Sequence, residues 1–306
     1  MTWRIQLPQS TIRRVNLLTN STSIVAVWSQ ADHVHFFDQR NGKALGERVV
    51  ESLTSVEHED ERWRTFLKSL RAPNDAYLPY VRTSGITIMT TADGNIRLYQ
   101  KANDDSLAIE IGGKEYLLEI EPGARFLTLD MDLTLGLIAA LDTHGRLHVY
   151  QQRIRVGIFD LGLSLDDEYT PTILVPDGGK QLFVTDGKQI VVSDTGGKIL
   201  CRMELHYPLG LSAVTPDGKT LMTSDADTGV LRAYSTEELS PTHQRFAIDL
   251  AADARRLNPA AALQPGNFVP STLAINNRGV VAFGLVGLLC VTSLSKMKAI
   301  PASTPG

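Results

Sequence analysis

Short runs of alternating apolar and polar residues fill most of this chain, and turns rich in glycine and aspartate separate them. A clear example is Val214 to Tyr234, which reads VTPDGKTLMTSDADTGVLRAY. A Pro-Asp-Gly-Lys turn at residues 216–219 joins its first two runs, and Gly229 lies in the turn before the last run. Alternation with a period of two is typical of half-buried strands, and such turn residues are typical of hairpins. The segment therefore predicts three antiparallel strands.

The same order of strand and turn recurs along the sequence. The segment from Leu174 to Asp194 repeats it as LVPDGGKQLFVTDGKQIVVSD, and four weaker copies can be aligned on their turns. The six aligned copies end at Phe37, Tyr99, Tyr150, Val192, Tyr234 and Thr292. Two of the spacings are 42 residues, and the other three are longer. A period of about 40 to 45 residues with four short strands per unit is typical of a β-propeller.

The two ends of the sequence predict how such a propeller closes. Several units end on an apolar–acid–apolar phrase: LLEI at 117–120, IFDL at 158–161, RMEL at 202–205 and AIDL at 247–250. The last unit is followed by SLSKMKAIPASTPG, a poor outermost strand, whereas RIQL at residues 4–7 resembles RMEL. An open ring would leave an unpaired sheet edge, so we expect Trp3 to Leu7 to supply the outer strand of the last blade. The prediction is a single all-β domain over residues 1–306, a six-bladed β-propeller closed by an N-terminal strand.

These phrases resemble the superfamily of WD-repeat and YVTN-type β-propellers. The resemblance extends over nearly the whole chain and is most specific at residues 174–194 and 214–234. The Gly-His and Trp-Asp dipeptides of WD repeats are absent, so no particular family is indicated. The resemblance implies a fold that carries many functions, and the function must therefore come from individual sites.

The longest departure from the period is an insertion at residues 57–75, EHEDERWRTFLKSLRAPND, between the first two blades. Its apolar residues recur at helical spacing: Trp63, Phe66, Leu67 and Leu70. Acidic residues at the start and basic residues at the end also favour a short helix. Its apolar face either packs on the propeller or meets a partner protein. For the second case, the candidate partner-binding residues are Trp63, Phe66, Arg62 and Arg64.

A second insertion lengthens the second unit. It reads AIEI at 108–111, then Gly112 and Gly113, then KEYLLEI. Because two glycines suit a two-residue turn, this segment predicts an extra hairpin. A third insertion spans residues 251–268.

Composition and charge limit the partners. The chain has 30 basic and 34 acidic residues, which lacks the positive excess that binding to nucleic acid requires. The N-terminal residues show no secretory signal, and the apolar run from Val280 to Val291 is too short to span a bilayer. We therefore expect a cytoplasmic protein that binds neither nucleic acid nor membrane. Cys201 and Cys290 lie in apolar segments and are expected to be reduced core residues.

Residues suited to catalysis are few. His33 and His35 lie two apart on a predicted strand and could share a metal, but no third ligand is evident. His144 and His148 flank the Gly145 turn and are expected at the surface. The GxSxG, GxGxxG and P-loop motifs are absent. The sequence therefore predicts no metal and no cofactor.

An enzymatic site would lie where the innermost strands meet the central channel. Those strands are expected to be VNLLTN, YVRTSG, RFLTLD, TILVPD, LSAVTPD and STLAIN. Near their turns stand the candidate channel-mouth residues Asp130, Asp177, Asp217 and Asn276. Aspartates in such turns commonly only initiate the turn.

The function predicted from these features is a noncatalytic β-propeller scaffold that mediates protein–protein interaction in a cytoplasmic multiprotein assembly. A rigid ring would hold its loops and the inserted helix in fixed positions, which lowers the ordering cost of binding. Some YVTN-type propellers resemble lactone-hydrolysing enzymes. The alternative is therefore a small-molecule hydrolase of the lactone type, or a ligand sensor, that acts at the central channel.

Overall fold

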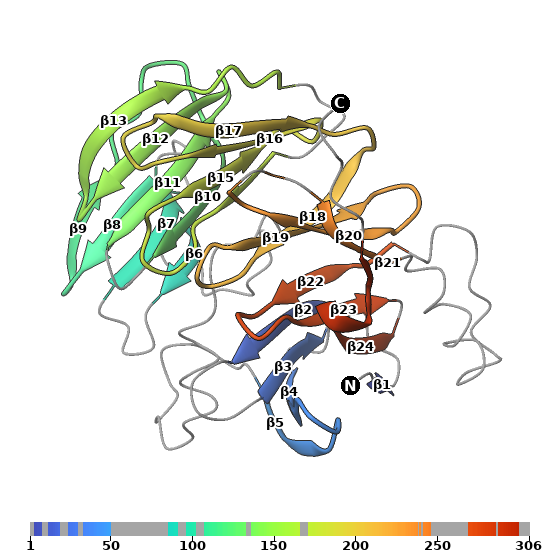
Figure 1. Cartoon of the computed structure of the whole chain (residues 1–306). Helices are drawn as coiled ribbons and strands as arrows, with labels where there is room; N and C mark the ends of the chain where they lie inside the picture. The colour runs from blue at the N-terminus through green and yellow to red at the C-terminus, as the bar shows by residue number, and fades with distance from the viewer. Residues whose placement is uncertain are drawn as a thin grey trace, which may run out of the picture. The chain divides into compact units, whose positions relative to one another are not determined.

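The structure is a computed structural model, and the elements that it describes are almost all β-strands (Figure 1). It describes residues 3–7, 12–18, 24–29, 33–49, 85–90, 96–101, 107–132, 136–165, 171–237, 239, 241–245, 269–285 and 287–299. Within these ranges the strands form six antiparallel sheets, accompanied by one short 3-10 helix, η1 (Leu294–Lys296). None of the described helical segments is long and apolar enough to cross a membrane. The chain divides into two compact units, residues 1–50 with 205–306 and residues 51–204.

Unit 1, residues 1–50 with 205–306, contains three of the sheets. The first consists of β2 (Ile12–Leu18), β3 (Ile24–Ser29), β4 (His33–Asp38) and β5 (Ala44–Val49). The second consists of β18 (Leu209–Val214), β19 (Thr220–Asp225), β20 (Leu231–Ser235), β21 (Pro241–Arg245) and β25 (Lys298–Ala299). The third consists of β22 (Thr272–Ile275), β23 (Val280–Leu285), β24 (Leu288–Ser293) and β1 (Trp3–Gln6).

The N-terminal strand β1 is the outer strand of the sheet formed by the end of the chain, as predicted (Figure 1). It pairs antiparallel with β24 from Trp3 opposite Val291 to Gln6 opposite Leu288. The backbone N–H of Leu7 continues the pairing by donating to the carbonyl of Gly287 at 2.9 Å. Apolar residues of β1, β2, β3 and β24 pack in one cluster. This packing holds the first and last sheets of the sequence together.

A tryptophan fixes the start of β1. The indole N–H of Trp3 donates to the carbonyl of Gln39 at 2.7 Å, in the turn between β4 and β5. The Trp3 ring lies so close to Gly42 that a Cβ there would stand 2.8 Å from it. Gly42 also has a φ of +74°, so this turn requires glycine for two reasons.

Unit 2, residues 51–204, contains the other three sheets. The first consists of β6 (Gly85–Thr90), β7 (Ile96–Lys101), β8 (Leu107–Ile111) and β9 (Lys114–Leu117). The second consists of β10 (Phe126–Asp132), β11 (Leu137–Asp142), β12 (Arg146–Gln151) and β13 (Ile154–Asp160). The third consists of β14 (Thr172–Leu174), β15 (Leu182–Thr185), β16 (Gln189–Ser193) and β17 (Ile199–Glu204). Two apolar clusters fill the spaces between neighbouring sheets of this unit.

The repeat read from the sequence matches the strands. The predicted ends of the six copies all lie on strands that follow the aligned turns: β4, β7, β12, β16, β20 and β24. The extra hairpin is confirmed as β8 and β9, with Gly112 and Gly113 at φ values of +56° and +77°. The prediction that the phrase LLEI ends the second unit as its outer strand is wrong. Strand β9 ends at Leu117, and the apolar–acid–apolar phrase on the strand that pairs with β7 is AIEI, in β8.

The C-terminal segment contributes a strand to a different sheet from the one it follows. After η1, β25 pairs with β21, with Ala299 opposite His243 and Lys298 opposite Gln244. The predicted helix at 57–75, the insertion at 251–268 and the phrase AIDL lie outside the described residues, as does YVRTSG except for Gly85.

The two cysteines are free thiols. Cys290 is buried in β24, as predicted, whereas Cys201 is only half-buried in β17. Burial raises the pKa of the Cys201 thiol. The apolar run from Val280 to Val291 forms β23 and most of β24 around Gly287, as the sequence predicted.

Candidate protein-interaction surface

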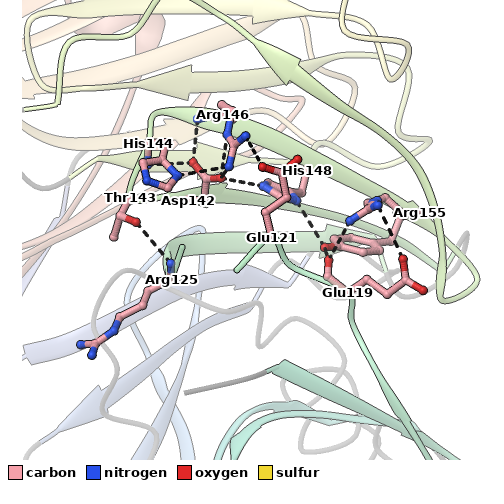
Figure 2. Close-up of polar contacts among 10 residues, drawn as sticks. Glu119, Glu121, Arg125, Asp142, Thr143, His144, Arg146, His148 and Arg155 are labelled. Atoms are coloured by element: carbon pink, nitrogen blue, oxygen red, sulfur yellow. Dashed lines mark hydrogen bonds and ion pairs between the residues drawn. The ribbon is translucent and has the colours of Figure 1, made fainter. Parts of the chain in front are cut away.

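A buried aspartate–histidine pair fixes the turn between β11 and β12 (Figure 2). Asp142 ends β11, and its Oδ1 accepts the backbone N–H groups of His144 at 2.9 Å and Arg146 at 3.0 Å. Its Oδ2 lies 2.8 Å from Nε2 of His148, and both side chains have no exposed surface. The expectation that His148 lies at the surface is therefore wrong, whereas His144 is exposed as predicted.

The electrostatic surroundings keep Asp142 ionised. Burial opposes its charge, but hydrogen bonds from His148, Arg146 and the backbone outweigh burial and hold its pKa below the usual range. Arg146 continues the network, because its guanidinium also pairs with Glu121 at 2.5 Å. A charged acceptor with several donors makes strong hydrogen bonds, so the turn is held firmly.

The same network fastens the β12–β13 hairpin to the segment that follows β9. The hydroxyl of Tyr150 donates to the backbone carbonyl of Glu119 at 2.5 Å. The Arg155 guanidinium lies 3.6 Å from the Glu119 carboxylate (Figure 2). Burial raises the pKa of Tyr150, so its hydroxyl remains a donor at neutral pH. The hairpin therefore has a fixed position within unit 2.

The turn of this hairpin adopts a conformation that its residues disfavour. Gln152 and Arg153 both have positive φ, 47° and 76°, although two-residue turns of this kind usually use glycine, asparagine or aspartate. Such a conformation costs roughly 1 kcal/mol or more for each residue. It places the Arg153 guanidinium 3.9 Å from the centre of the Tyr116 ring, which is a cation–π contact.

Exposed apolar side chains lie next in sequence to both residues of this contact, Leu117 after Tyr116 and Ile154 after Arg153. Among the described residues, every exposed large hydrophobic side chain belongs to unit 2: Ile111, Leu117, Leu127, Ile154, Val156, Ile199 and Leu200. The most exposed is Ile154 at 70%, followed by Leu117 and Val156 at 54% each. We call Tyr116, Leu117, Arg153, Ile154 and Val156 the rim patch. Tyrosine and arginine are enriched where interfaces gain most of their binding energy, and exposed apolar side chains that form a continuous patch are typical of contact surfaces.

Sequence reasoning missed the rim patch. The signal available was the phrase QQRIRVGIF, in which aliphatic residues alternate with arginine or glycine directly after the repeat end at Tyr150. Alternation alone predicts a strand but does not show which of its faces is exposed. The predicted partner-binding residues Trp63, Phe66, Arg62 and Arg64 lie outside the described residues.

Two of the predicted channel-mouth residues lie in unit 2, on neighbouring segments. Asp130 in β10 is buried, and its Oδ2 accepts the backbone N–H of Val175 at 2.7 Å. Asp132 makes the equivalent contact, accepting the N–H of Gly178 at 2.9 Å, beside the exposed Asp177. Carboxylates of β10 thus hold the segment that follows β14.

The other two lie in unit 1 and belong to adjoining turns. The side-chain oxygen of Asn276 accepts the N–H groups of Arg278 and Val280, both at 3.0 Å. An Asp217 carboxylate oxygen accepts the Thr215 hydroxyl at 2.7 Å, and its backbone N–H donates to the side chain of Asn277 at 3.0 Å. The structure therefore brings the two turns together through Asn277.

The histidine pair considered as a metal site lies on β4. The rings of His33 and His35 stack with centroids 6.2 Å apart, and Nδ1 of His35 lies 3.3 Å from a carboxylate oxygen of Glu47. Burial lowers the pKa of His35, although Glu47 opposes this shift. No group of three metal-ligating side chains occurs in the part of the chain that the structure describes.

The sheets and their order define a protein with the fold of the WD-repeat-type β-propellers. The WD40 β-propeller domain of Doa1 is similar at a TM-score of 0.57 and 13% identity, over 97% of this chain and 96% of that one. The β-propeller domain of Cps50 (Swd1) from Myceliophthora thermophila is similar at a TM-score of 0.52 and 11% identity, over 92% and 82%. Raptor from Chaetomium thermophilum is similar at 0.54 and 10%, over 96% of this chain but 25% of its own.

At these identities the likeness concerns the fold. No family model matches the sequence, and no curated protein matches it.

Proposed function

We propose that this protein is a noncatalytic scaffold that holds partner proteins within a cytoplasmic assembly. Its residues 1–306 would form one six-bladed ring, closed by β1 and carrying a helical insertion at 57–75. The pairing of β1 with β24 supports closure, and the similarity to the Doa1 propeller over nearly the full length of both chains supports a single domain. A closed ring presents its surfaces without first having to order them, which favours binding.

The observation that carries this proposal is the rim patch. Ile154 and Val156 leave apolar area in water on the β12–β13 hairpin, which a buried hydrogen-bond network holds, and Leu117 does so on β9, next in sequence to Tyr116. Covering them with a partner recovers hydrophobic free energy. Because the hairpin is already fixed, little conformational entropy is lost on binding.

A scaffold also requires more than one contact. Trp63 and Phe66, with Arg62 and Arg64, remain our candidates for a second partner-binding surface on the inserted segment. The side chains of Asp130, Asp217 and Asn276 accept hydrogen bonds that hold turns, which supports a structural role for them.

The scaffold function is tested by purifying the tagged chain from its native host and identifying proteins that co-elute at constant stoichiometry. Each identified protein is then produced separately, and its affinity for the purified chain is measured by calorimetry. We expect binding in the absence of added metal, and Ile154→Lys to weaken at least one partner about tenfold or more. Leu127→Lys is the control, because Leu127 is 46% exposed but lies on β10, at the other edge of the same sheet.

Two results would contradict the proposal. One is a chain that elutes alone and binds none of the candidate proteins. The other is turnover of a lactone substrate by the purified chain, abolished by replacing Asp130 or Asp217, which would favour the hydrolase.

A further inference from the structure

The outer strand β13 is less protected against pairing with another chain than the other described outer strands. In unit 1, β24 is covered by β1 and β21 is covered by β25. The outer strands β5, β9 and β17 carry exposed charges, among them Glu47, Lys114 and Arg202. Proteins commonly protect edge strands in these two ways, by a covering segment or by charge. In β13, seven residues long, the one exposed charged residue is Asp160 at its end, because Arg155 is partly buried and lies 3.6 Å from the Glu119 carboxylate.

We propose that β13 accepts an extended segment of a partner protein as an added strand, and that an acidic residue of this segment pairs with Arg153. This inference rests on the proposed scaffold function and specifies how one partner binds. The added strand would form backbone hydrogen bonds with β13 and cover Ile154 and Val156.

The same molecule contains an example of such an addition in unit 1. The outer strand β21 has a bulge at Thr242, because Ala233 is opposite His243 and Tyr234 is opposite Pro241. The residues directly after this bulge, His243 and Gln244, are those that pair with β25. A covering strand of two residues is therefore sufficient at this position of a sheet.

Strand β13 has its bulge at the corresponding position. Val149 is opposite Gly157 and Tyr150 is opposite Arg155, which leaves Val156 as the bulged residue. Tyr150 and Tyr234 both end the aligned repeat, so Gly157 and Ile158 correspond to His243 and Gln244. We infer that the added strand pairs at Gly157 and Ile158 and extends toward Ile154.

The positive charge of Arg153 in the rim patch indicates that the partner segment carries an acidic residue. The guanidinium of Arg153 stacks on Tyr116, and among the described residues no carboxylate forms an ion pair with it. In an antiparallel added strand, the residue that faces Arg153 follows those that face Val156 and Ile154. The segment should therefore have aliphatic residues at alternate positions, followed directly by aspartate or glutamate.

The experiment uses the full chain and a synthetic fluorescent peptide of eight residues. In this glutamate peptide, valine alternates with threonine, and glutamate follows the last valine. Binding is measured by fluorescence anisotropy, and hydrogen exchange of the β13 amides is measured with and without the peptide. We expect saturable binding, weakened in a scrambled peptide, together with slower exchange at residues 154–160. Slower exchange distinguishes strand pairing from side-chain contact.

Three variants locate the site. The double variant I154K/V156K should bind the glutamate peptide about tenfold or more weakly, because it puts charges on the edge. The control is Leu127→Lys, since Leu127 is also a bulged residue of similar exposure, in β10. Arg153→Glu should weaken the glutamate peptide about threefold and strengthen a peptide with lysine in place of glutamate. A variant that had merely unfolded would not bind either peptide.

Several outcomes overturn the proposal. The first is affinity for the glutamate peptide weaker than about 1 mM, or equal affinity for the scrambled one. The second is unchanged exchange of the β13 amides in the complex. The third is a wild-type dimer that becomes monomeric in I154K/V156K, which would make a second copy the occupant. If native partners still bind the chain in any of these cases, the scaffold function stands and only the added strand is wrong.

Discussion

The sheet β10–β13 of unit 2 and the sheet β18–β21 with β25 of unit 1 follow the same plan but are held in different ways. Each has an aspartate at the end of its second strand, Asp142 or Asp225, and a tyrosine on its third strand, Tyr150 or Tyr234. Two positions before the tyrosine, the first sheet has His148 and the second has Arg232. The residue at this position decides whether a histidine or an arginine side chain contacts the aspartate.

In the first sheet, His148 is fully buried and lies at hydrogen-bond distance from Asp142, 2.8 Å. In the second, the Arg232 guanidinium lies 3.9 Å from the Tyr207 ring centre and 3.5 Å from an Asp225 oxygen. A buried charge-assisted hydrogen bond contributes more than a longer, partly exposed ion pair. The comparison teaches that the sheet with the exposed edge has the stronger internal network, whereas the other sheet has its edge covered by β25.

The largest effect is expected for His148→Leu. This change leaves the buried Asp142 carboxylate without one of its donors, and it should lower the free energy of unfolding by about 3 kcal/mol. Urea denaturation followed by circular dichroism measures it. His144→Leu is the control. The exposed His144 ring meets this network at the Arg146 guanidinium, 3.1 Å away, and an exposed contact of this kind should cost under about 0.5 kcal/mol. Equal losses for the two variants would show that the buried pair contributes little.

A smaller difference is expected between the two tyrosines. Tyr150→Phe removes the donor to the Glu119 carbonyl and should cost about 1 to 2 kcal/mol. Tyr234→Phe should cost about half as much, because Tyr207 keeps its second hydroxyl contact, 2.8 Å from Thr223. Chemical denaturation of both variants gives the comparison, and a larger loss for Tyr234→Phe would reverse our ranking of the two networks.

Replacing Arg232 should matter still less. In Arg232→Met the apolar stem can still pack on Tyr207, and Asp225 keeps the backbone N–H groups of Asp227 and Thr228. We expect a loss of at most about 1 kcal/mol in a thermal or urea melt. A loss as large as that of His148→Leu would show that the longer ion pair is as important as the buried one.

Lowering the pH from neutral should have the smallest effect, because the stability that Asp142 contributes changes only in acid. The pKa of Asp142 is lowered in the folded chain, so its contribution is fully present above the unfolded value of about 4 and is lost as pH falls through the lower folded value. The stability difference between wild type and Asp142→Asn should stay constant from about pH 7 to 5 and shrink below about pH 4. Urea melts at several pH values test this, and a gap that widens in acid would mean that the shift has the opposite sign.

Much of the fold could be predicted because strand period and turn chemistry are local properties. The turns at Pro216 and Gly229 repeat recognisably elsewhere, and RIQL near the N-terminus resembles RMEL closely enough to identify β1 as an outer strand. The covering strand β25 could not be predicted in the same way. Lys298 and Ala299 have no strand pattern of their own, and their pairing depends on the edge that β21 presents.

The candidate surface was harder to predict than the strands. The sequence pattern indicates that residues near 154–158 alternate, but exposure of Ile154 depends on what packs against β13. The burial of His148 was missed for the same reason, since a histidine beside a glycine turn is usually exposed.

The sequence by itself determined where strands and turns lie, because backbone preferences and apolar alternation act over a few neighbouring residues. Only the tertiary structure decided which polar groups are buried and which sheet edges are covered. Those outcomes depend on segments far apart in the chain, such as Arg155 meeting Glu119 and β1 meeting β24. Pairing between distant segments has no local signature, because its free energy comes from burial and hydrogen bonds that exist only after folding.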